Sequence, residues 1–385
     1  MMCTRCSNPR NLDVKKSDTE GAKRAPTSKP PFTLADIKKA IPPHCFERSW
    51  IRSFSYLIYD ITAVGIFYYL ATIYIPQLPR PLPYLAWPVY WFLQGCVFVG
   101  VWFLGHECGH NAFSDHVWLD DLIGFILHSC LLTPYFSLKI SHRRHHANTG
   151  SLQHDEVHVP KTKSKLWSSV VYLNNPIGRT LTILVKLTLG WYFYLSINAA
   201  GRPYDKFASH YDPRSPIFSE KERGLILISD IGLLSFCYLL YTVVRIHGFA
   251  YVFCVYGGAL MVMNAFLVTI TYLHHTHPSL PHYNDCEWSW MKGAFATVDR
   301  DYGVLNKVFH NITDTHVLHH LFAHIPHYHA MEATKAIRPI VGDFYQSDNT
   351  PFFVALWRES KNCLFIELDE SNEKSRGIYW FRSQY

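Results

Sequence analysis

The chain has 385 residues, of which 49% are hydrophobic, 16% aromatic and only 17% charged. Soluble domains of this size carry about a quarter charged residues, so the composition excludes an ordinary soluble domain and indicates a membrane protein. The formal net charge is +6, and eleven Lys and Arg against five Asp and Glu precede Ser53. A basic segment just before an apolar run is typical of a cytosolic N-terminus rather than of nucleic-acid binding.

Residues 1–50 are polar and rich in proline, which predicts a flexible basic arm with no signal peptide. Two apolar runs follow, Ser55–Ile75 and Tyr84–Leu104. Each has about 21 residues, enough at ~1.5 Å per residue to cross a hydrocarbon core ~30 Å thick. Because the linker between them is short and rich in proline, we predict a transmembrane hairpin.

A second pair of apolar runs, Leu225–Val244 and Phe249–Tyr272, predicts another hairpin. Leu119–Phe136 and Thr180–Ala200 are also apolar, and each either crosses the membrane or lies along its surface. We therefore predict an all-α integral membrane protein with four crossings and two interfacial helices, six crossings being the alternative. Either even number leaves all the histidine-rich segments on one side of the membrane, where they form a cytosolic cap.

Eight of the 23 histidines form three compact motifs, HECGH, HRRHH and HVLHH. The motifs contain His106, His110, His142, His145, His146, His316, His319 and His320. Spacings of three and four residues place imidazoles on one face of a helix. Since a tetrahedral zinc takes only four ligands, we predict that two metal ions share the set. His275 or His277, at the end of the last apolar run, is a candidate ninth ligand.

Charged residues near these motifs are candidates to orient the rings by hydrogen bonding, and they are Glu107, Asp155, Glu156, Asp299, Arg300, Asp301 and Asp314. The first motif also satisfies H-E-x-x-H, which is typical of zinc metalloproteases whose glutamate is the general base. An intramembrane zinc protease using Glu107 is thus an alternative. That alternative leaves the other two histidine motifs without a role.

The three motifs, in this order around apolar hairpins, resemble those of the membrane fatty-acyl desaturases. Longer stretches, among them GRPYDKFASHYDP, TVDRDYGVLNKVFHNITDTHV and PHYHAMEATKAI, are similar to the plant microsomal oleate Δ12 (omega-6) desaturases. The similarity extends from about Pro30 to Tyr385. It implies that residues 51–385 form a desaturase domain in which the histidines hold two iron ions and O2 is the co-substrate.

The resemblance also implies a multi-pass enzyme of the endoplasmic reticulum membrane that converts oleate to linoleate on phosphatidylcholine. Cytochrome b5, with NADH-cytochrome b5 reductase, would supply the electrons, and nucleic acid would not be a partner. The C-terminus, FRSQY, resembles an aromatic retention signal, although Gln384 stands where that signal usually has a charged residue.

Diverged relatives that make hydroxy, acetylenic, epoxy or conjugated fatty acids share the same motifs. Positions that resemble these relatives are Gly105, Asn111, Leu318, Ala323 and Ile325. We expect Asn111 to alter the metal site and Leu318 to crowd it. Thr149 instead matches the desaturase pattern, where the castor-type hydroxylase has Ile. One methylene near the metals shifts acyl placement by about 1 kcal/mol, or about fivefold in product ratio, so the sequence leaves the product open.

Overall fold

The computed structural model describes residues 23–165, 172–369 and 377–383, and five helical stretches in these ranges are long and apolar enough to cross a membrane. Their main helices are α2 (Trp50–Tyr74), α3 (Leu82–Gly109), α7 (Pro176–Ile197), α8 (Arg223–His247) and α10 (Gly258–His275). Short turns extend three of them, namely η2 (Ile75–Gln77) after α2, η4 (Glu220–Glu222) before α8, and α9 (Phe249–Val252) with the π-helical turn η5 (Phe253–Gly257) before α10. Each of the four predicted spans lies within one of these stretches.

The two apolar runs for which membrane crossing was left open differ in structure, since one forms a single long helix and the other forms two helices joined at a bend. Thr180–Ala200 overlaps α7, which qualifies as a fifth candidate span. Leu119–Phe136 instead covers most of α4 (Val117–Cys130) and the start of α5 (Tyr135–Asn148), two helices bent by 109° that would together count as a sixth candidate span, either broken or re-entrant. Pro134 lies at the break between the two helices. Proline interrupts a helix because it has no N–H to continue the hydrogen-bond ladder. The bend allows α5, with the second histidine motif, to pack against α3.

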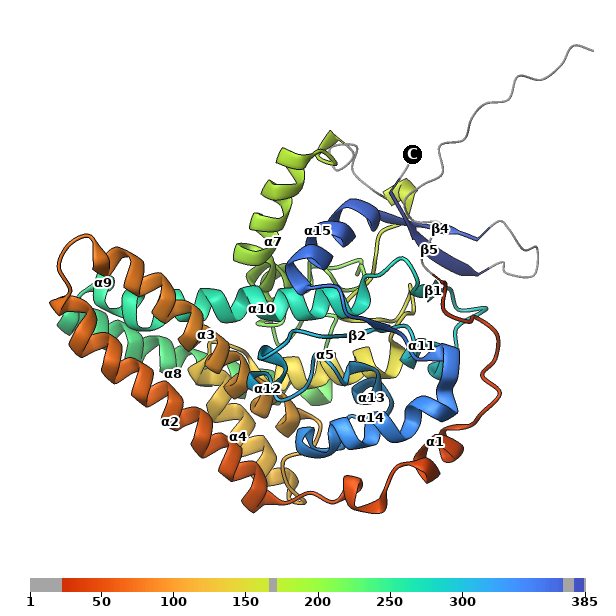
Figure 1. Cartoon of the computed structure of the whole chain (residues 1–385), viewed down its shortest axis with the longest axis horizontal. Helices are drawn as coiled ribbons and strands as arrows, with labels where there is room; N and C mark the ends of the chain where they lie inside the picture. Colours follow the sequence, from red (N-terminus) through yellow and green to blue (C-terminus); the bar gives the residue numbers. More distant parts are fainter. Residues whose placement is uncertain (1–22, 166–171, 370–376, 384–385) are drawn as a thin grey trace, which may run out of the picture.

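The long helices α2, α3, α8 and α10 extend together toward one end of the molecule, and α10 packs on both α3 and α7 (Figure 1). The largest hydrophobic cluster fills the space between them with side chains such as Val99, Leu104, Met263 and Leu267. The outer faces of α2, α7 and α8 expose large apolar side chains. A continuous apolar exterior of this kind is expected of a lipid-facing surface.

The opposite end of the molecule consists of short elements, most of them from the last third of the chain (Figure 1). They are β1 (Pro281–Tyr283), α11 (Trp290–Ala294), β2 (Asp299–Arg300), α12 (Leu305–Val308), α13 (His316–Leu321), α14 (His327–Val341), η6 (Gly342–Phe344), β3 (Ser347–Asp348), α15 (Phe352–Asn362), β4 (Phe365–Leu368) and β5 (Ile378–Arg382). β1, β5 and β4 form an antiparallel sheet in that order, and β2 pairs with β3 in parallel. The protein is mostly helical as predicted, but the all-α prediction missed these sheets because such short strands show no readable alternation.

The N-terminal segment is folded from residue 23 onward, where a flexible arm was expected. α1 (Leu34–Ala40) begins with a capping box between Thr33 and Asp36, and the 3₁₀ turn η1 (Pro43–Phe46) follows. Ile37 and Cys45 are fully buried in a second hydrophobic cluster that α13 and α14 complete. Burial of these apolar side chains offsets the entropy of ordering the segment. Residues 1–22 of the predicted arm and the last two residues of the predicted retention signal lie outside the described ranges.

Candidate metal centre

Four helices bring nine histidines to one place. His106 and His110 lie at the end of α3, His275 is the last residue of α10, and α5 and α13 carry the other six, His142, His145, His146, His316, His319 and His320. Six pairs of these rings bring their Nε2 atoms to 2.7–3.3 Å from each other. Three of the pairs lie within one helix and three join rings of different helices, so nitrogens from all four helices aim their lone pairs at common points.

The imidazoles divide into two groups that differ in burial. We call His106, His110, His142, His146 and His319 the outer cluster, whose ligand nitrogens all lie within 4.8 Å of one another. The same limit joins His145, His275 and His320, and His316 lies 3.3 Å from His275 and 3.2 Å from His320, both between Nε2 atoms. These four form the inner cluster, and all of them are buried, whereas only His106 of the outer cluster is.

The geometry distinguishes the two candidates for the ninth ligand. His275 joins the inner cluster, whereas His277 turns away and places its Nε2 3.7 Å from a carboxylate oxygen of Asp348. Burial lowers the pKa of His277 to about 4, so its ring is neutral there. His274 is also excluded, because both its ring nitrogens face backbone carbonyl oxygens, those of Ile270 and Thr313.

The chemistry of the donor set fits metal binding. Burial, together with the neighbouring imidazoles, holds the pKa values of His316, His319 and His320 well below the ordinary value for histidine. These rings are therefore neutral at physiological pH, which is the form that ligates a metal. The Nε2 atom of His319 is buried and has no hydrogen-bond partner in the described part of the chain. An orphaned buried nitrogen beside other imidazoles is expected where a cation supplies the missing contact.

Two side chains fix the tautomers of inner-cluster rings. Nδ1 of His145 lies 2.7 Å from Oδ1 of the buried Asp155, to which it donates. Oγ1 of Thr149 donates to the His145 carbonyl oxygen at 2.7 Å and lies 3.1 Å from Nδ1 of His320, so it accepts the proton of that ring. Both contacts leave Nε2 of the ring free for a metal. Thr149, selected from sequence as a product-tuning position, thus contacts a candidate ligand directly.

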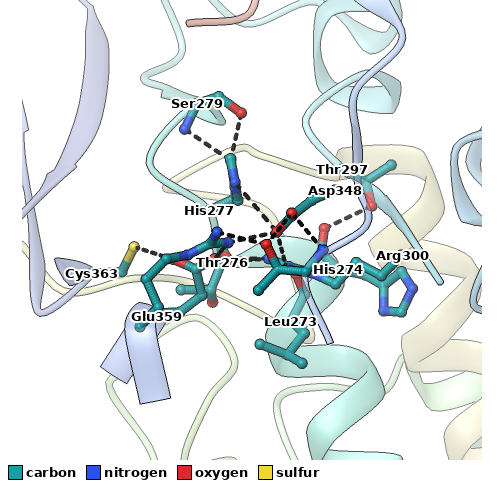
Figure 2. Close-up of polar contacts among 12 residues, drawn as sticks. Leu273, His274, Thr276, His277, Ser279, Thr297, Arg300, Asp348, Glu359 and Cys363 are labelled. Carbon is teal, nitrogen blue, oxygen red and sulfur yellow. Dashed lines mark hydrogen bonds and ion pairs between the residues drawn. The ribbon is translucent and has the colours of Figure 1, made fainter. Parts of the chain in front are cut away.

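A buried arginine supports the end of α10 behind the inner cluster. Nε of Arg300 donates to the carbonyl oxygen of Leu273 at 2.8 Å and Nη2 donates to that of Thr276 at 3.2 Å, so the guanidinium bonds backbone on both sides of His275 (Figure 2). Carboxylate oxygens of Asp348 and Glu359 lie 2.5 and 3.0 Å from the guanidinium and balance its charge. The network therefore holds the backbone on both sides of His275 and so sets the direction of its side chain.

Glu107 does not have the arrangement of a protease base. Its two oxygens accept hydrogen bonds from the backbone N–H and from Nδ1 of His327, each at 2.6 Å, and its side chain is buried. The carboxylate thus ties the first histidine motif to the start of α14. No sequence pattern indicates His327 as a partner, because the two residues lie 220 positions apart.

Of the remaining predicted orienting carboxylates, Asp299 accepts a hydrogen bond from the backbone N–H of Val317 at 2.7 Å and so supports the first turn of α13. Glu156, Asp301 and Asp314 have other hydrogen-bond partners, which are Arg202 and Tyr204, Gly303 and Asn306, and Asn311. Those three carboxylates therefore serve the surrounding loops rather than the rings.

The structure gives different roles to the positions that resemble diverged relatives. A Cβ atom at Gly105 would lie 2.5 Å from Cδ2 of His128, whose Nε2 is 3.0 Å from the carbonyl oxygen of Trp102. A side chain at position 105 must therefore displace that buried ring. Asn111 adopts a left-handed conformation with φ of 54°, and its carbonyl oxygen accepts from Arg48 at 2.9 Å. The amide of Asn111 has no contact with a cluster histidine among the hydrogen bonds of the described residues.

We expected Leu318 to crowd the metal centre, and the structure shows that it does not. At 100° per residue, Leu318 lies on the face of α13 opposite His316, His319 and His320. Its side chain is buried in the second hydrophobic cluster, together with Ile325. Ala323 lies between these two residues in the turn after α13 and is half-buried.

An apolar cavity of about 380 Å³ lies between α7 and α10. Its walls include Val185, Trp191, Val268 and Tyr272 from the two helices. His158 is also part of the wall, and its ring centroid lies 6.1 Å from that of His275 of the inner cluster. The cavity is thus separated from the inner cluster by the ring of His158.

Comparison with known proteins gives two family matches. The family described as fatty acid desaturase matches residues 85–352, and a domain of unknown function matches residues 5–70. Similar proteins include a Delta(12)-fatty-acid desaturase FAD2 of Vernicia fordii, 61% identical over 96% of this chain and 97% of the relative. An omega-6 fatty acid desaturase, endoplasmic reticulum isozyme 1, of Glycine max is 59% identical over 97% and 96%. The oleoyl-12-hydroxylase FAH12 of Ricinus communis is 59% identical over 94% of both chains.

Proposed function

This chain belongs to the fatty acid desaturase family and is an oxidoreductase, and on that premise we propose that it is an acyl-lipid Δ12 desaturase. Its substrate is an 18-carbon oleoyl chain on phosphatidylcholine, and its product is the linoleoyl chain. The observation that carries the proposal is the convergence of nine imidazoles in two clusters, in a chain that matches a Delta(12) desaturase over nearly its whole length.

We assign the outer cluster to one iron ion and the inner cluster to the other. Bound there, the two ions would supply the O2 activation that removes hydrogen from C12 and the adjacent methylene. In the net reaction two adjacent methylenes lose two hydrogens and become a double bond. One O2 takes up these hydrogens, together with two electrons and two protons, and is reduced to two waters. Imidazole-only donors suit iron, but they also suit zinc and copper, so metal analysis of the purified enzyme is the direct test of this assignment.

The residues of the chain hold the substrate and the rings. The cavity between α7 and α10 receives the acyl chain, because its walls are largely apolar and one of them is His158, whose ring centroid is 6.1 Å from that of His275. An acyl chain has no polar group near C12, so the depth to which it enters the cavity selects the methylene that reacts. Asp155, Thr149 and Arg300 keep the inner rings in one orientation while the chain enters.

We place the enzyme in the endoplasmic reticulum membrane, with residues 51–385 as the catalytic domain and the N-terminus and both clusters on the cytosolic side. The name of the Glycine max relative and the basic residues before α2 support this placement. Cytochrome b5, reduced by NADH-cytochrome b5 reductase, is the proposed donor, because the reaction needs two electrons that the acyl chain does not supply.

The second candidate is a hydroxylase, which would insert oxygen at C12 instead of removing a second hydrogen. The similarity to the Ricinus communis hydroxylase supports it. The hydrogen bond between Thr149 and His320 favours the desaturase, since the isoleucine of the hydroxylase pattern offers no oxygen to accept the Nδ1 proton.

Expression in yeast, followed by gas chromatography–mass spectrometry of the membrane lipids, tests the proposal. We expect linoleate in cells with the wild-type chain, and none above the empty-vector background in cells with His145→Ala. A hydroxy, epoxy or acetylenic product without linoleate would replace the Δ12 desaturase by that activity. Full activity of His145→Ala would contradict the ligand assignment.

A further inference from the structure

A third group of metal-binding side chains lies outside the two imidazole clusters, where η1 meets α14. His44 and Cys45 come from η1, and His329 and Glu332 come from the first turns of α14. One ligand atom from each of the four residues lies within 4.8 Å of every other. Nitrogen, sulfur and oxygen donors from two segments far apart in the chain thus converge at one point.

Local structure brings each pair of donors together. His329 and Glu332 are three residues apart on α14, so both project from the same face of that helix. Pro42 and Pro43 lead into η1, where the backbone N–H of Cys45 donates to the carbonyl oxygen of Pro42 at 2.9 Å. This tight turn directs two consecutive side chains, His44 and Cys45, toward α14. The four-residue set therefore exists only because η1 docks on the helix.

The contacts within the group are those of donors that share a point. Nε2 of His44 lies 3.0 Å from Oε2 of Glu332, and the ring centroids of His44 and His329 are 5.3 Å apart. Cys45 is fully buried, whereas the side chains of His44 and Glu332 are 50% and 52% exposed. A fully buried thiol thus lies beside two donor side chains that solvent reaches.

Glu332 accepts a hydrogen bond from the Cys45 thiol and pairs with His44, so one carboxylate already draws three of the four side chains together. The imidazole of His329 completes a set of four donors around the same point. Two imidazoles, one thiolate and one carboxylate are ligands that zinc accepts, and four is its usual coordination number. Tetrahedral zinc requires ligand atoms ~3.3–3.7 Å apart, so any pair near the 4.8 Å limit would close by about 1 Å, while the His44–Glu332 pair at 3.0 Å would open slightly.

We propose that His44, Cys45, His329 and Glu332 form a structural zinc site, separate from the imidazole clusters and independent of the Δ12 assignment. Binding converts the Cys45 thiol to a thiolate and releases its proton to solvent. The zinc fastens the N-terminal segment to α14. The first residue of α14, His327, binds Glu107 of the first histidine motif, so the fastening also supports the wall of the outer cluster.

Metal analysis of the full-length protein, purified from membranes and dialysed against metal-free buffer, tests the site. We expect Cys45→Ser to hold about one zinc per chain less than the wild type, and His329→Asn to bind zinc at least about tenfold more weakly. His324→Asn is the matched control, because that imidazole stacks on Phe46 at 5.7 Å but is not one of the four donors. Its zinc content should equal that of the wild type.

Cobalt provides a second measurement that does not depend on a buried substitution. Addition of Co2+ to the zinc-depleted wild-type chain should produce a thiolate-to-cobalt charge-transfer band, and His329→Asn, a change at a half-buried position, should reduce it. Equal zinc in the wild type, Cys45→Ser and His329→Asn, or the absence of the charge-transfer band, overturns the proposal. Neither result bears on the fatty-acid product, so failure of this site and failure of the Δ12 assignment are distinguishable.

Discussion

The inner and outer clusters present the same ligand type in different surroundings. All four inner rings are buried, and Asp155 and Thr149 hold Nδ1 of His145 and His320. In the outer cluster four of the five rings are only half-buried, and Nδ1 of His106 and of His146 has no hydrogen-bond partner in the described ranges. Two of the inner rings, His145 and His320, are thus oriented by protein side chains, whereas Nδ1 of the inner His316 has no partner in the described ranges, like that of the outer His106 and His146.

This difference predicts which positions around the two clusters tolerate substitution. A ring whose second nitrogen is bonded keeps its tautomer before metal arrives, and removal of the partner changes metal affinity or activity. A ring without such a partner has no comparable contact to lose. We therefore expect the most informative substitutions around the inner cluster, beginning with a ligand and ending with a residue that acts through the backbone.

The largest effect should follow removal of an inner ligand. His275→Ala should lower linoleate formation by more than about 100-fold and reduce bound metal, because it deletes a ring from the fully buried set. His277→Ala is the matched control, since that ring faces Asp348, and it should stay within about threefold of the wild type. Lipid analysis and metal content would measure both. The reverse order of effects would assign the ninth ligand to His277.

A smaller effect should follow loss of the carboxylate that orients His145. Asp155→Asn should lower activity and metal affinity by about 10–100-fold, because the amide cannot stabilise the ring as the carboxylate does. Glu156→Gln, a neighbouring buried carboxylate that pairs with Arg202, controls for general damage to the loop. Equal losses in both variants would mean that Asp155 acts only on folding.

Thr149 should show a still smaller effect, and mainly on the product. Thr149→Val keeps the volume but removes the oxygen that accepts from His320, and loss of one hydrogen bond of about 1 kcal/mol changes a product ratio by about fivefold. Thr149→Ser retains the hydroxyl and should behave as the wild type. The ratio of hydroxylated to desaturated product reports this directly. An unchanged ratio in Thr149→Val would exclude position 149 from product control.

The smallest effect should come from the charge network behind His275. Although its carboxyl is partly buried, hydrogen bonds from Thr350 and Arg358 and the charge of Arg300 hold the pKa of Asp348 well below its usual range. The ionised group therefore stabilises the fold above the unfolded-state pKa of about 3.9, and this stability is lost as the pH falls through that value toward the folded-state pKa.

Asp348→Asn should consequently melt about 2–4 °C below the wild type at pH 7, and the difference should narrow at about pH 3. Thermal unfolding of the purified protein at the two pH values would measure it. A difference that grew as the pH fell would contradict the assigned direction of the pKa shift. Metal content measured alongside would show whether the network also keeps His275 in place.

Spacing alone identified eight of the nine clustered histidines. Residues three and four apart share a helix face whatever surrounds them. The histidines of the three motifs could therefore be assigned to common faces before any fold was known. The four predicted spans were equally readable, because a long apolar run has few alternatives to a membrane helix. The family resemblance, which the family match confirms, added the reaction class.

Only the tertiary structure decided which rings share a cluster. The second motif sends His142 and His146 to the outer cluster and His145 to the inner one, whereas the third motif sends His319 to the outer cluster and His316 and His320 to the inner one. Tertiary packing also chose His275 over His277, turned Leu318 away from the metals, and paired Glu107 with His327. The physical reason is common to all four cases. Helical periodicity sets the face on which a side chain lies, but packing between distant segments decides what that face meets.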